Sequence, residues 1–561
     1  MTVATLSRER RAPAWSNWLI LVAALGFLVP LVVAAVTGNL AIPHNDSWAY
    51  SRIAATFAHT GTIRLLNANR ASLIGQVVAL GPLGTSIVTQ QVAVAVMSLP
   101  CLYAVYWVAG ITLGEAGAVF AALTVALWPG YASLATSFMS DVPALAGTVG
   151  ALALGWKALS SDSRRWLVAS MVVAFWAATV REQALAAPAA VLIYGAVTHR
   201  TRLRTGAVAI GVAIATFAVL FLAFEAWRYS LPHGDHPQNN FSPYLMVRNV
   251  LSDGPKAYYT LAIPLAPACF LTFGSRRWTP AAWTAAGVVV LYALVNLLRH
   301  KGFTLGSYLA AQGEYRALNP GGPNVIPGGL WTLVILIGVI SGAVLAATVV
   351  VRWREIDPVL GLFTVITAVA TLGERAVGQM IFDRYLIALV PGVLSVVLAG
   401  EGLRKPAWRR RSADAIRATF RSKRLTLVAA TAVFMTVISA ALAANQFAYD
   451  SMHWHEAAAF TARGVPATRV DGGFEWLGYY ARDGLRTSPG FPNGFVSQES
   501  LFYTSPSCIV LTAERDPRPP RATEHWTRID DFRYHTFLVT GTAHMFAYAT
   551  HAKGCPRLQP A

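Results

Sequence analysis

Long apolar runs recur along this chain and constrain its fold more than any other feature. The first extends from about Trp18 to Thr37, roughly the 20 residues that a helix needs to cross a bilayer. Others follow at about 84–109, 115–134, 140–158, 166–181, 183–198, 206–227, 256–274, 280–298, 329–351, 358–377, 385–401 and 425–444. The pattern predicts an all-α polytopic membrane protein with about thirteen transmembrane helices.

The charge content agrees with a membrane setting. Only 13% of the residues are charged and 55% are hydrophobic, whereas soluble domains carry about 25% charged residues. The net charge of +18 raises the question of a nucleic-acid partner. Because the basic residues form short clusters between apolar runs and no continuous basic face, we exclude nucleic acid and expect the lipid bilayer as a partner.

The basic clusters also predict the orientation of the chain. Residues 7–11 form a basic flank before the first run, as in a signal peptide, but the run is longer than most signal-peptide cores. We therefore expect an uncleaved first helix with a cytoplasmic amino end. The even connections are then cytoplasmic, and they hold Lys157, Arg164, Arg165, Arg200, Arg202, Arg204, Arg276, Arg277, Arg352, Arg354 and the run Arg404 to Arg424.

The opposite connections carry charges of both signs. The first external loop, about 38–83, should contain interfacial helices. Because ionisable groups near a bilayer are costly unless they are paired or face a polar cavity, these loops should hold the working residues on the extracytoplasmic face. The charged residues in question are Asp46, Arg52 and Arg64 in the first loop, then Asp141, Arg181, Glu182, Asp383 and Arg384.

The sequence divides into a membrane domain, 1–444, and an extracytoplasmic domain, 445–561. The second part has short alternating apolar runs separated by Pro and Gly, which predicts a small α/β or β-rich domain. It contains Cys508 and Cys555. In an oxidising compartment they could form a disulfide and stabilise the domain by about 3 to 4 kcal/mol, but two free thiols are an equally open alternative.

Two acidic residues are candidates for catalysis. Asp46, just past the first apolar run, could act as general base toward an acceptor hydroxyl, or could simply cap a helix. Asp141, with Pro143 two residues later, has the pattern of an ordinary helix start. It could also orient an acceptor, or hold a divalent cation together with Asp46. The cofactor is otherwise unknown.

Arginines at the outer face are candidates for binding phosphate. Arg181 and Glu182 interrupt an apolar stretch and either neutralise each other or leave Arg181 to grip a lipid phosphate. Arg384, followed by Tyr385, is either an interfacial anchor or a bidentate phosphate ligand. Arg52 and Arg64 are weaker candidates of the same kind.

Three passages together resemble the GT-C superfamily of polyprenyl-phosphate-sugar-dependent glycosyltransferases. They are similar to passages in bacterial aminoarabinose lipid A transferases and in protein O-mannosyltransferases. The run from Asp46 through Tyr50 resembles the Asp-Glu-x-x-Tyr opening of the first external loop, although Ser47 stands where the family has its second acid. The other two passages are Trp128-Pro129 with Ser140-Asp141-Val142-Pro143, and Phe382-Asp383-Arg384-Tyr385-Leu386 with Pro391.

The resemblance implies a multi-pass glycosyltransferase of the inner (cytoplasmic) membrane of a bacterial cell, with an extracytoplasmic active site. Its partners would be a polyprenyl-phosphate-linked sugar and a glycolipid, polysaccharide or protein acceptor. Asp46 would be the general base, Asp141 would position the acceptor, and arginines would hold the lipid phosphate. The resemblance also implies substrate-binding roles for Tyr50, Arg52, Arg64, Arg181, Glu182, Arg384 and Tyr385.

Two other classes of protein remain open at this stage. A transporter or flippase of lipid-linked sugars would share the apolar bulk and the arginines, but it would favour polar or broken helices at the bilayer midplane. A non-enzymatic envelope assembly scaffold would use the C-terminal domain as its working part. It would give no reason for the charged outer loops.

Overall fold

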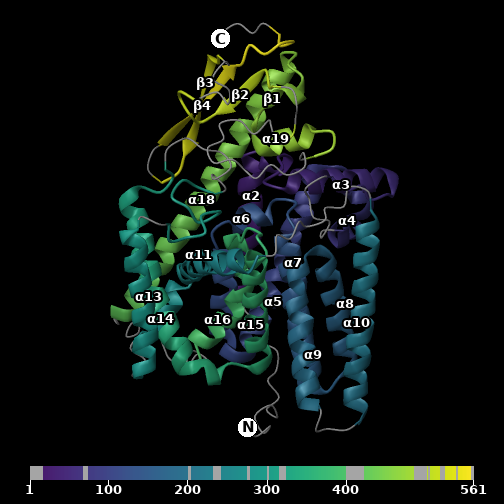
Figure 1. The fold of residues 1–561 in the computed structure, drawn as a ribbon, viewed down its shortest axis with the longest axis vertical. Helices are drawn as coiled ribbons and strands as arrows, with labels where there is room; N and C mark the ends of the chain where they lie inside the picture. The colour runs from purple at the N-terminus through teal and green to yellow at the C-terminus, as the bar shows by residue number, and fades with distance from the viewer. Residues whose placement is uncertain are drawn as a thin grey trace.

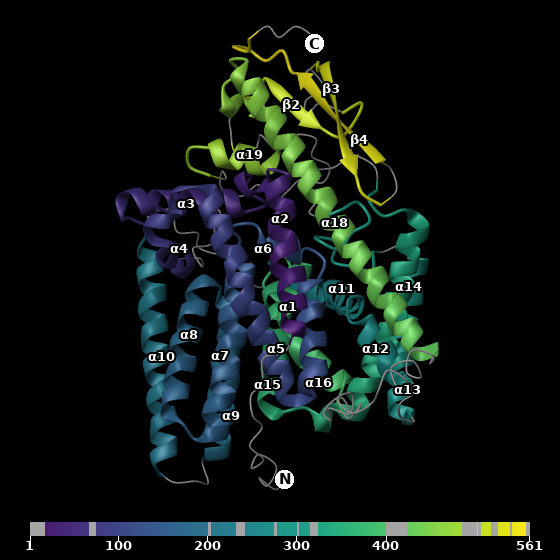
Figure 2. The same cartoon turned by 180° about the vertical axis from the view of Figure 1, so that it is seen from behind.

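A bundle of long helices carries a small β-sheet domain at one end (Figures 1 and 2). The computed structural model describes residues 17–66, 74–199, 204–231, 242–273, 278–299, 302–314, 324–399, 423–484, 502, 506–517, 525–538 and 541–556.

The helices follow the predicted apolar runs. In the first half they are α1 (Trp18–Ala23), α2 (Val29–Val36), α3 (Ser47–Thr60), α4 (Ile74–Leu80), α5 (Ile87–Ala126), α6 (Tyr131–Ala135), α7 (Asp141–Ser161), α8 (Arg164–Val180), α9 (Ala186–His199) and α10 (Arg204–Ser230). In the second half they are α11 (Pro243–Ala262), α12 (Ala266–Thr272), α13 (Pro280–Leu298), α14 (Gly328–Arg352), α15 (Pro358–Ala376), α16 (Val390–Val397) and α18 (Lys423–Ala462). Short 3-10 or π-helical segments connect some of them: η1 (Ala24–Leu28), η2 (Asn39–Ala41), η4 (Gly81–Thr85), η5 (Glu182–Leu185), η7 (Trp353–Glu355) and η8 (Asp383–Leu389).

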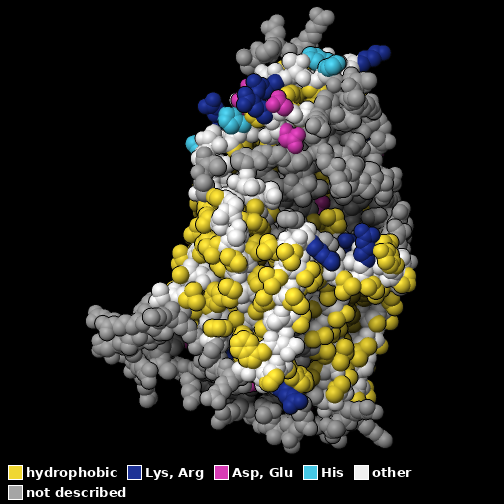
Figure 3. Space-filling view, turned by 60° about the vertical axis from the view of Figure 1, so that its left-hand side comes forward, with side chains coloured by type: hydrophobic (Ala, Val, Ile, Leu, Met, Phe, Trp, Pro, Cys, Tyr) yellow, Lys and Arg dark blue, Asp and Glu magenta, His cyan; other side chains and the backbone are white. Residues whose placement is uncertain are grey.

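Among the residues that the structure describes, eight helical segments are long and apolar enough to cross a membrane. The prediction of a helical multi-pass membrane protein is thus confirmed. The number differs from about thirteen partly because α8 and α9, which match the runs 166–181 and 183–198, have only 17 and 14 residues. In Figure 3, hydrophobic side chains spread over the helical part, and acidic and histidine side chains lie mostly over the C-terminal domain.

The two predicted runs 84–109 and 115–134 meet within α5. Gly114 interrupts the helix with φ 76° and ψ −174°, a backbone conformation that glycine adopts without steric cost. Leu102 and Ala126, one on each side of this break, both lie against Gly26 of η1. The two arms of α5 therefore fold back beside each other, and one 40-residue segment holds most of the first run and the beginning of the second.

Charges separate between the two ends of the bundle. Lys157 lies near the end of α7, Arg164 begins α8 and Arg352 ends α14. Asp141 begins α7 and therefore lies at the opposite end, where α3 and α4 cross the tops of the helices (Figure 1). This distribution agrees with the basic clusters and mixed outer loops predicted from the sequence.

The helix α3 joins the membrane bundle to the C-terminal domain. It ends at Gly61, whose φ of 67° suits a left-handed C-cap, and the Gly61 N–H donates to the Phe57 carbonyl at 2.8 Å. Trp48 is fully buried and packs edge-on against Phe474 of α19 (Gly473–Tyr480), with ring centroids 6.1 Å apart. Gly478 of α19 lies so close to the indole that a Cβ there would come within 2.3 Å of it.

The C-terminal domain is a four-stranded sheet packed against the end of α18. The strand order is β1-β2-β4-β3, parallel between β1 and β2 and antiparallel elsewhere. The long helix α18 runs from the bundle into this domain (Figure 2), where Tyr449 and Phe460 join its core. The elements are η10 (Ala467–Arg469), β1 (Val470–Asp471), β2 (Ile509–Thr512), β3 (Thr527–Thr536) and β4 (Gly541–Ala549). The small sheet agrees with the α/β or β-rich domain predicted from the sequence.

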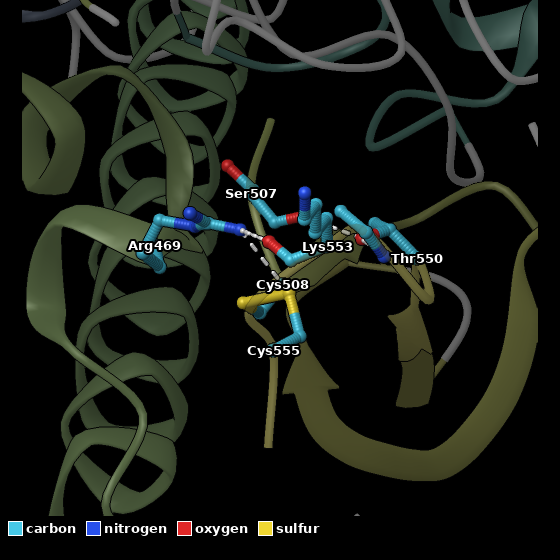
Figure 4. Close-up of a disulfide and its surroundings, with 7 residues drawn as sticks. Arg469, Ser507, Cys508, Thr550, Lys553 and Cys555 are labelled. Carbon is cyan, nitrogen blue, oxygen red and sulfur yellow. Dashed lines mark hydrogen bonds between the residues drawn. A yellow bond between two sulfur atoms is a disulfide. The ribbon is translucent and has the colours of Figure 1, made fainter. Parts of the chain in front are cut away.

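Cys508 and Cys555 form a disulfide beside β2 (Figure 4). It joins residues 47 positions apart. Arg469 donates to the carbonyl of Lys553 at 3.2 Å and contacts Cys555 Sγ at 3.3 Å. The bridge and these contacts fix the segment after β4 to the start of β2. The other cysteines, Cys101 and Cys269, are buried in the helical part as free thiols.

Candidate active site

Four charged residues from distant parts of the chain meet at the end of the bundle nearest the sheet domain. Arg181 Nη1 lies 2.5 Å from Asp141 Oδ1. Arg384 Nε lies 3.4 Å from the same oxygen, and Arg384 Nη2 lies 3.7 Å from Asp46 Oδ2. Two carboxylates and two guanidinium groups therefore form one continuous, charge-balanced group.

Each of these residues stands at the end of a helical segment. Asp46 precedes α3, and Asp141 is the first residue of α7. Arg181 follows α8 in an extended conformation, with φ −158° and ψ 128°, which turns the chain out of the helix. Arg384 lies in the first turn of η8. Helix ends can project polar side chains inward at the bundle's rim without breaking backbone hydrogen bonds inside the membrane.

Tyrosine rings surround the two arginines. The Arg181 guanidinium lies over Tyr385 at 4.2 Å from the ring centroid, and Arg384 lies 5.5 Å from the same ring. Arg384 Nη1 also donates to the Tyr308 hydroxyl at 3.4 Å. Stacking on aromatic faces holds a guanidinium in place while leaving its in-plane N–H donors directed elsewhere.

Arg181, Arg384, Asp141 and Tyr385 line one pocket at this end of the bundle. Sequence reasoning missed several polar residues of its wall, namely Tyr131, Gln183, Thr367 and Thr371. The four-residue spacing of the two threonines on α15 was a usable signal, because it places both on one face of the helix.

The Asp46 carboxyl is a suitable proton acceptor. Although 28% of its side chain is exposed, protein surrounds it closely enough that burial raises its pKa, with Arg384 opposing the shift. Its side chain makes no capping hydrogen bond to α3, so the helix-cap interpretation gains no support. A carboxylate with a raised pKa is a stronger base toward a hydroxyl.

Asp141 has one oxygen engaged and one available. Its Oδ1 contacts both arginines, whereas its buried Oδ2 has no hydrogen-bond partner among the described residues. A buried carboxylate oxygen without a donor is unfavourable, so a ligand hydroxyl placed there would be bound strongly.

The sequence left open a divalent cation shared by Asp46 and Asp141, and the structure has an arginine between these two carboxylates. Arg384 contacts both carboxylates and supplies the positive charge between them. We therefore derive no step through a metal ion at this position.

Other predicted substrate-binding residues lie in different environments. Arg52 donates to the carbonyls of Gly478, Ala481 and Arg482, so it fastens α3 to the end of α19. Glu182 accepts from Arg228 at 2.5 Å and is thereby paired away from Arg181. Arg64 is exposed. We do not carry these three residues into the candidate site.

Tyr50, another predicted substrate-binding residue, lies close enough to the charged group to be influenced by Asp46, Arg181 and Arg384. It lies one turn after Asp46 on α3 and is half-buried. Burial and the neighbouring Asp46 carboxylate raise the pKa of its phenol, so it is a neutral hydrogen-bond donor at the site.

Tyr308 is the most informative residue that sequence reasoning missed. Its hydroxyl contacts Arg384, Asn45 Nδ2 at 3.5 Å and His44 Nε2 at 3.4 Å. Asp383, which precedes Arg384, accepts from the N–H groups of Tyr308 and Leu309 at 2.6 and 2.7 Å. Asp383 therefore holds the loop of Tyr308 against Arg384, a pairing that nothing local in the sequence signals.

The middle of the chain matches a known family. Residues 75–227 match the family described as dolichyl-phosphate-mannose-protein mannosyltransferase. This stretch contains Asp141 and Arg181, two of the four charged residues of the site. The resemblance to GT-C glycosyltransferases is confirmed. It supports a glycosyltransferase-type enzyme built as a multi-pass membrane protein.

Solved structures show weaker likenesses. ArnT from Cupriavidus metallidurans, bound to undecaprenyl phosphate, is 14% identical, with 97% of this chain and 100% of that chain covered and a TM-score of 0.45. The apo oligosaccharyltransferase of Archaeoglobus fulgidus is 13% identical, with coverages of 85% and 62% and a TM-score of 0.40. No curated protein matches the chain by sequence.

Proposed function

We propose that this protein transfers a sugar, a hexose or a pentose, from a polyprenyl-phosphate donor to an acceptor hydroxyl at the extracytoplasmic face of a bacterial inner membrane. The observation that carries the proposal is the meeting of Asp46, Asp141, Arg181 and Arg384 in one charged group, of which Asp141, Arg181 and Arg384 line a pocket. The acceptor is a glycolipid, a polysaccharide or a protein.

The reaction is a single displacement. The acceptor oxygen forms a bond to the anomeric carbon and gives its proton to the Asp46 carboxylate. The bond from the anomeric carbon to the phosphate oxygen breaks, and its electron pair leaves with polyprenyl phosphate. Because the leaving group is already anionic, it needs positive charge more than it needs a general acid. Inversion at the anomeric carbon follows from one displacement.

Arg181 and Arg384 are the proposed phosphate ligands. Both are held in place by Asp141 and Tyr385. A phosphate entering the cavity would replace part of these ion pairs with bidentate contacts to the guanidinium groups. Asp141 Oδ2 would then accept from a sugar or acceptor hydroxyl, and Tyr50 and Tyr385 would line the sugar.

The proposed topology has about thirteen transmembrane helices, a cytoplasmic amino end and the domain from Asn445 onward outside the cell. It is supported by the basic residues at one end of the bundle and the candidate site at the other. An outer site also fits the donor class, because nucleotide sugars are confined to the cytoplasm and a lipid phosphate can cross the membrane.

Mass spectrometry of envelope glycans and glycolipids in a deletion strain tests the proposal. The deletion should remove one sugar from one envelope component, and the wild-type gene should restore it. Asp46→Asn should fail to restore the sugar, whereas Arg64→Gln, an exposed arginine of the same loop, should restore it. Full restoration by Asp46→Asn would contradict a transferase and favour a flippase or scaffold.

A further inference from the structure

A second cluster of ionisable side chains lies beside the candidate active site. His44, Asp450 and Glu475 come from the first external loop, from α18 and from α19. Each offers one ligand atom, and these atoms all lie within 4.8 Å of one another. His44 and Asp450 are each 6% exposed. None of these residues belongs to the proposed transfer mechanism.

Among the residues that the structure describes, the charges of this cluster do not balance. Two carboxylates face one imidazole, and His44 Nδ1 lies 2.9 Å from Asp450 Oδ2. Taking two carboxylates out of water without a matching positive charge costs several kcal/mol. A bound divalent cation would remove that cost.

We propose that His44, Asp450 and Glu475 bind a zinc ion. One imidazole nitrogen and two carboxylate oxygens are ligands that zinc accepts, at about 2.0 to 2.2 Å each. Magnesium and calcium prefer an all-oxygen shell with six or more ligands. Tetrahedral zinc needs its ligand atoms about 3.4 Å apart, so the observed separations require only small side-chain rotations.

Neighbouring groups already orient each of the three ligands. Gln446 Nε2 donates to Asp450 Oδ1 at 2.7 Å, and the Asn45 N–H donates to Glu475 Oε1 at 3.0 Å. The Tyr308 hydroxyl lies 3.4 Å from His44 Nε2. With His44 bound through Nδ1, the Nε2–H would donate to Tyr308, the outer-shell hydrogen bond that metal-binding histidines commonly make.

Two residues that hydrogen-bond the proposed ligands each have a side-chain oxygen without a partner among the described residues. The side-chain oxygens of Asn45 and Gln446, the residues that hydrogen-bond Glu475 and Asp450, are buried and without a partner among the described residues. Asn45 is 0% exposed and Gln446 is 3% exposed. Buried carbonyl oxygens without donors are rare, and a zinc-bound water would satisfy them.

The zinc would fasten the first external loop to the C-terminal domain. Its three ligands lie on three segments that contact one another, and His44 stands two residues before Asp46. Asn45 between them has a φ of 54°, a strained conformation for a residue other than glycine. A metal that fixes His44 would hold this turn and thereby keep Asp46 in place.

The test measures metal content and thermal unfolding of the full-length protein in detergent, purified without a histidine tag from cells grown with zinc. We expect about one zinc per chain in the wild type and less than about a tenth of that in His44→Gln and Glu475→Gln. His455→Gln is the matched control, because this exposed histidine lies on the same helix as Asp450. It should keep the zinc.

The wild type alone also decides the matter if the variants do not fold. Protein purified after growth in zinc-depleted medium should unfold at a higher temperature when zinc is added, and manganese at equal concentration should raise it less. The proposal is overturned if the wild type holds no zinc and added zinc leaves its unfolding temperature unchanged. It is equally overturned if Glu475→Gln keeps a full equivalent of zinc, or if the purified wild type contains manganese and no zinc.

Discussion

Two groups of charged side chains are joined through the short segment that contains His44 and Asp46. They differ in how their charge is balanced. Around Asp46, two carboxylates are matched by two arginines. Around His44, two carboxylates are matched by one histidine. The first group can exchange its internal ion pairs for a phosphate and a sugar. For the second we propose that a cation completes the charge balance, so the two neighbouring groups would have different roles.

The largest effect should come from Asp46→Asn. This variant removes the proton acceptor but keeps the shape of the side chain, so turnover should fall about 10²- to 10⁴-fold. Binding of radiolabelled polyprenyl phosphate should stay within about a few-fold of wild type, because the arginines that we assign to the phosphate remain. If turnover stays within a few-fold of wild type, Asp46 is not the base and the division of roles between the two groups is wrong.

Loss of the disulfide should destabilise the C-terminal domain, which contributes Asp450 and Glu475 to the second group, and should leave the first group unchanged. Cys508→Ser with Cys555→Ser opens a loop of 47 residues, which should lower the free energy of unfolding of the C-terminal domain by about 3 to 4 kcal/mol. Thermal unfolding of the double variant and of the reduced wild type should agree. The control is the double variant Cys101→Ser with Cys269→Ser, which removes two free thiols of the bundle. It shows whether replacing cysteines lowers the stability even when no disulfide is lost. Unchanged unfolding after loss of the bridge would contradict the prediction.

Arg384→Gln should weaken donor binding more than any change outside the charged group. It removes a guanidinium that contacts both carboxylates, so the affinity for polyprenyl phosphate should fall about 10- to 100-fold. The exposed Arg64 offers the comparison, since Arg64→Gln should leave the affinity within about twofold. Equal losses in the two variants would mean that general surface charge, and not the site, attracts the lipid.

Glu314, a buried carboxyl influenced by Asp383 and Asp450, should make the stability of the fold depend on pH. Burial raises its pKa to about 8, with Asp383 and Asp450 adding to the shift and a hydrogen bond from Ser133 opposing it. The unfolded chain releases this proton near pH 4.5. The folded chain therefore binds more protons above that pH, so stability should fall between about pH 4.5 and 8.

Glu314→Gln removes this titration. The variant should lose less stability than the wild type across the same pH range, and unfolding temperatures measured at several pH values would show the difference. Parallel curves for the two proteins would mean that Glu314 stays ionised in the fold.

Much of the architecture could be predicted from the sequence. Apolar runs of bilayer length, basic clusters and alternating segments after Asn445 are local patterns, and each is imposed by the solvent that its segment meets. Asp141, Arg181 and Arg384 were also predictable, because charged residues at the ends of apolar helices are too costly to be retained without a partner or a polar cavity.

Only the tertiary structure decided which charges meet. Arg52 and Arg181 look alike in sequence, yet one binds carbonyls of α19 and the other binds Asp141. Tyr308, and the cluster of His44, Asp450 and Glu475, join segments separated by hundreds of positions. Hydropathy acts on each segment separately, whereas an ion pair depends on two side chains whose separation is set by how the helices pack.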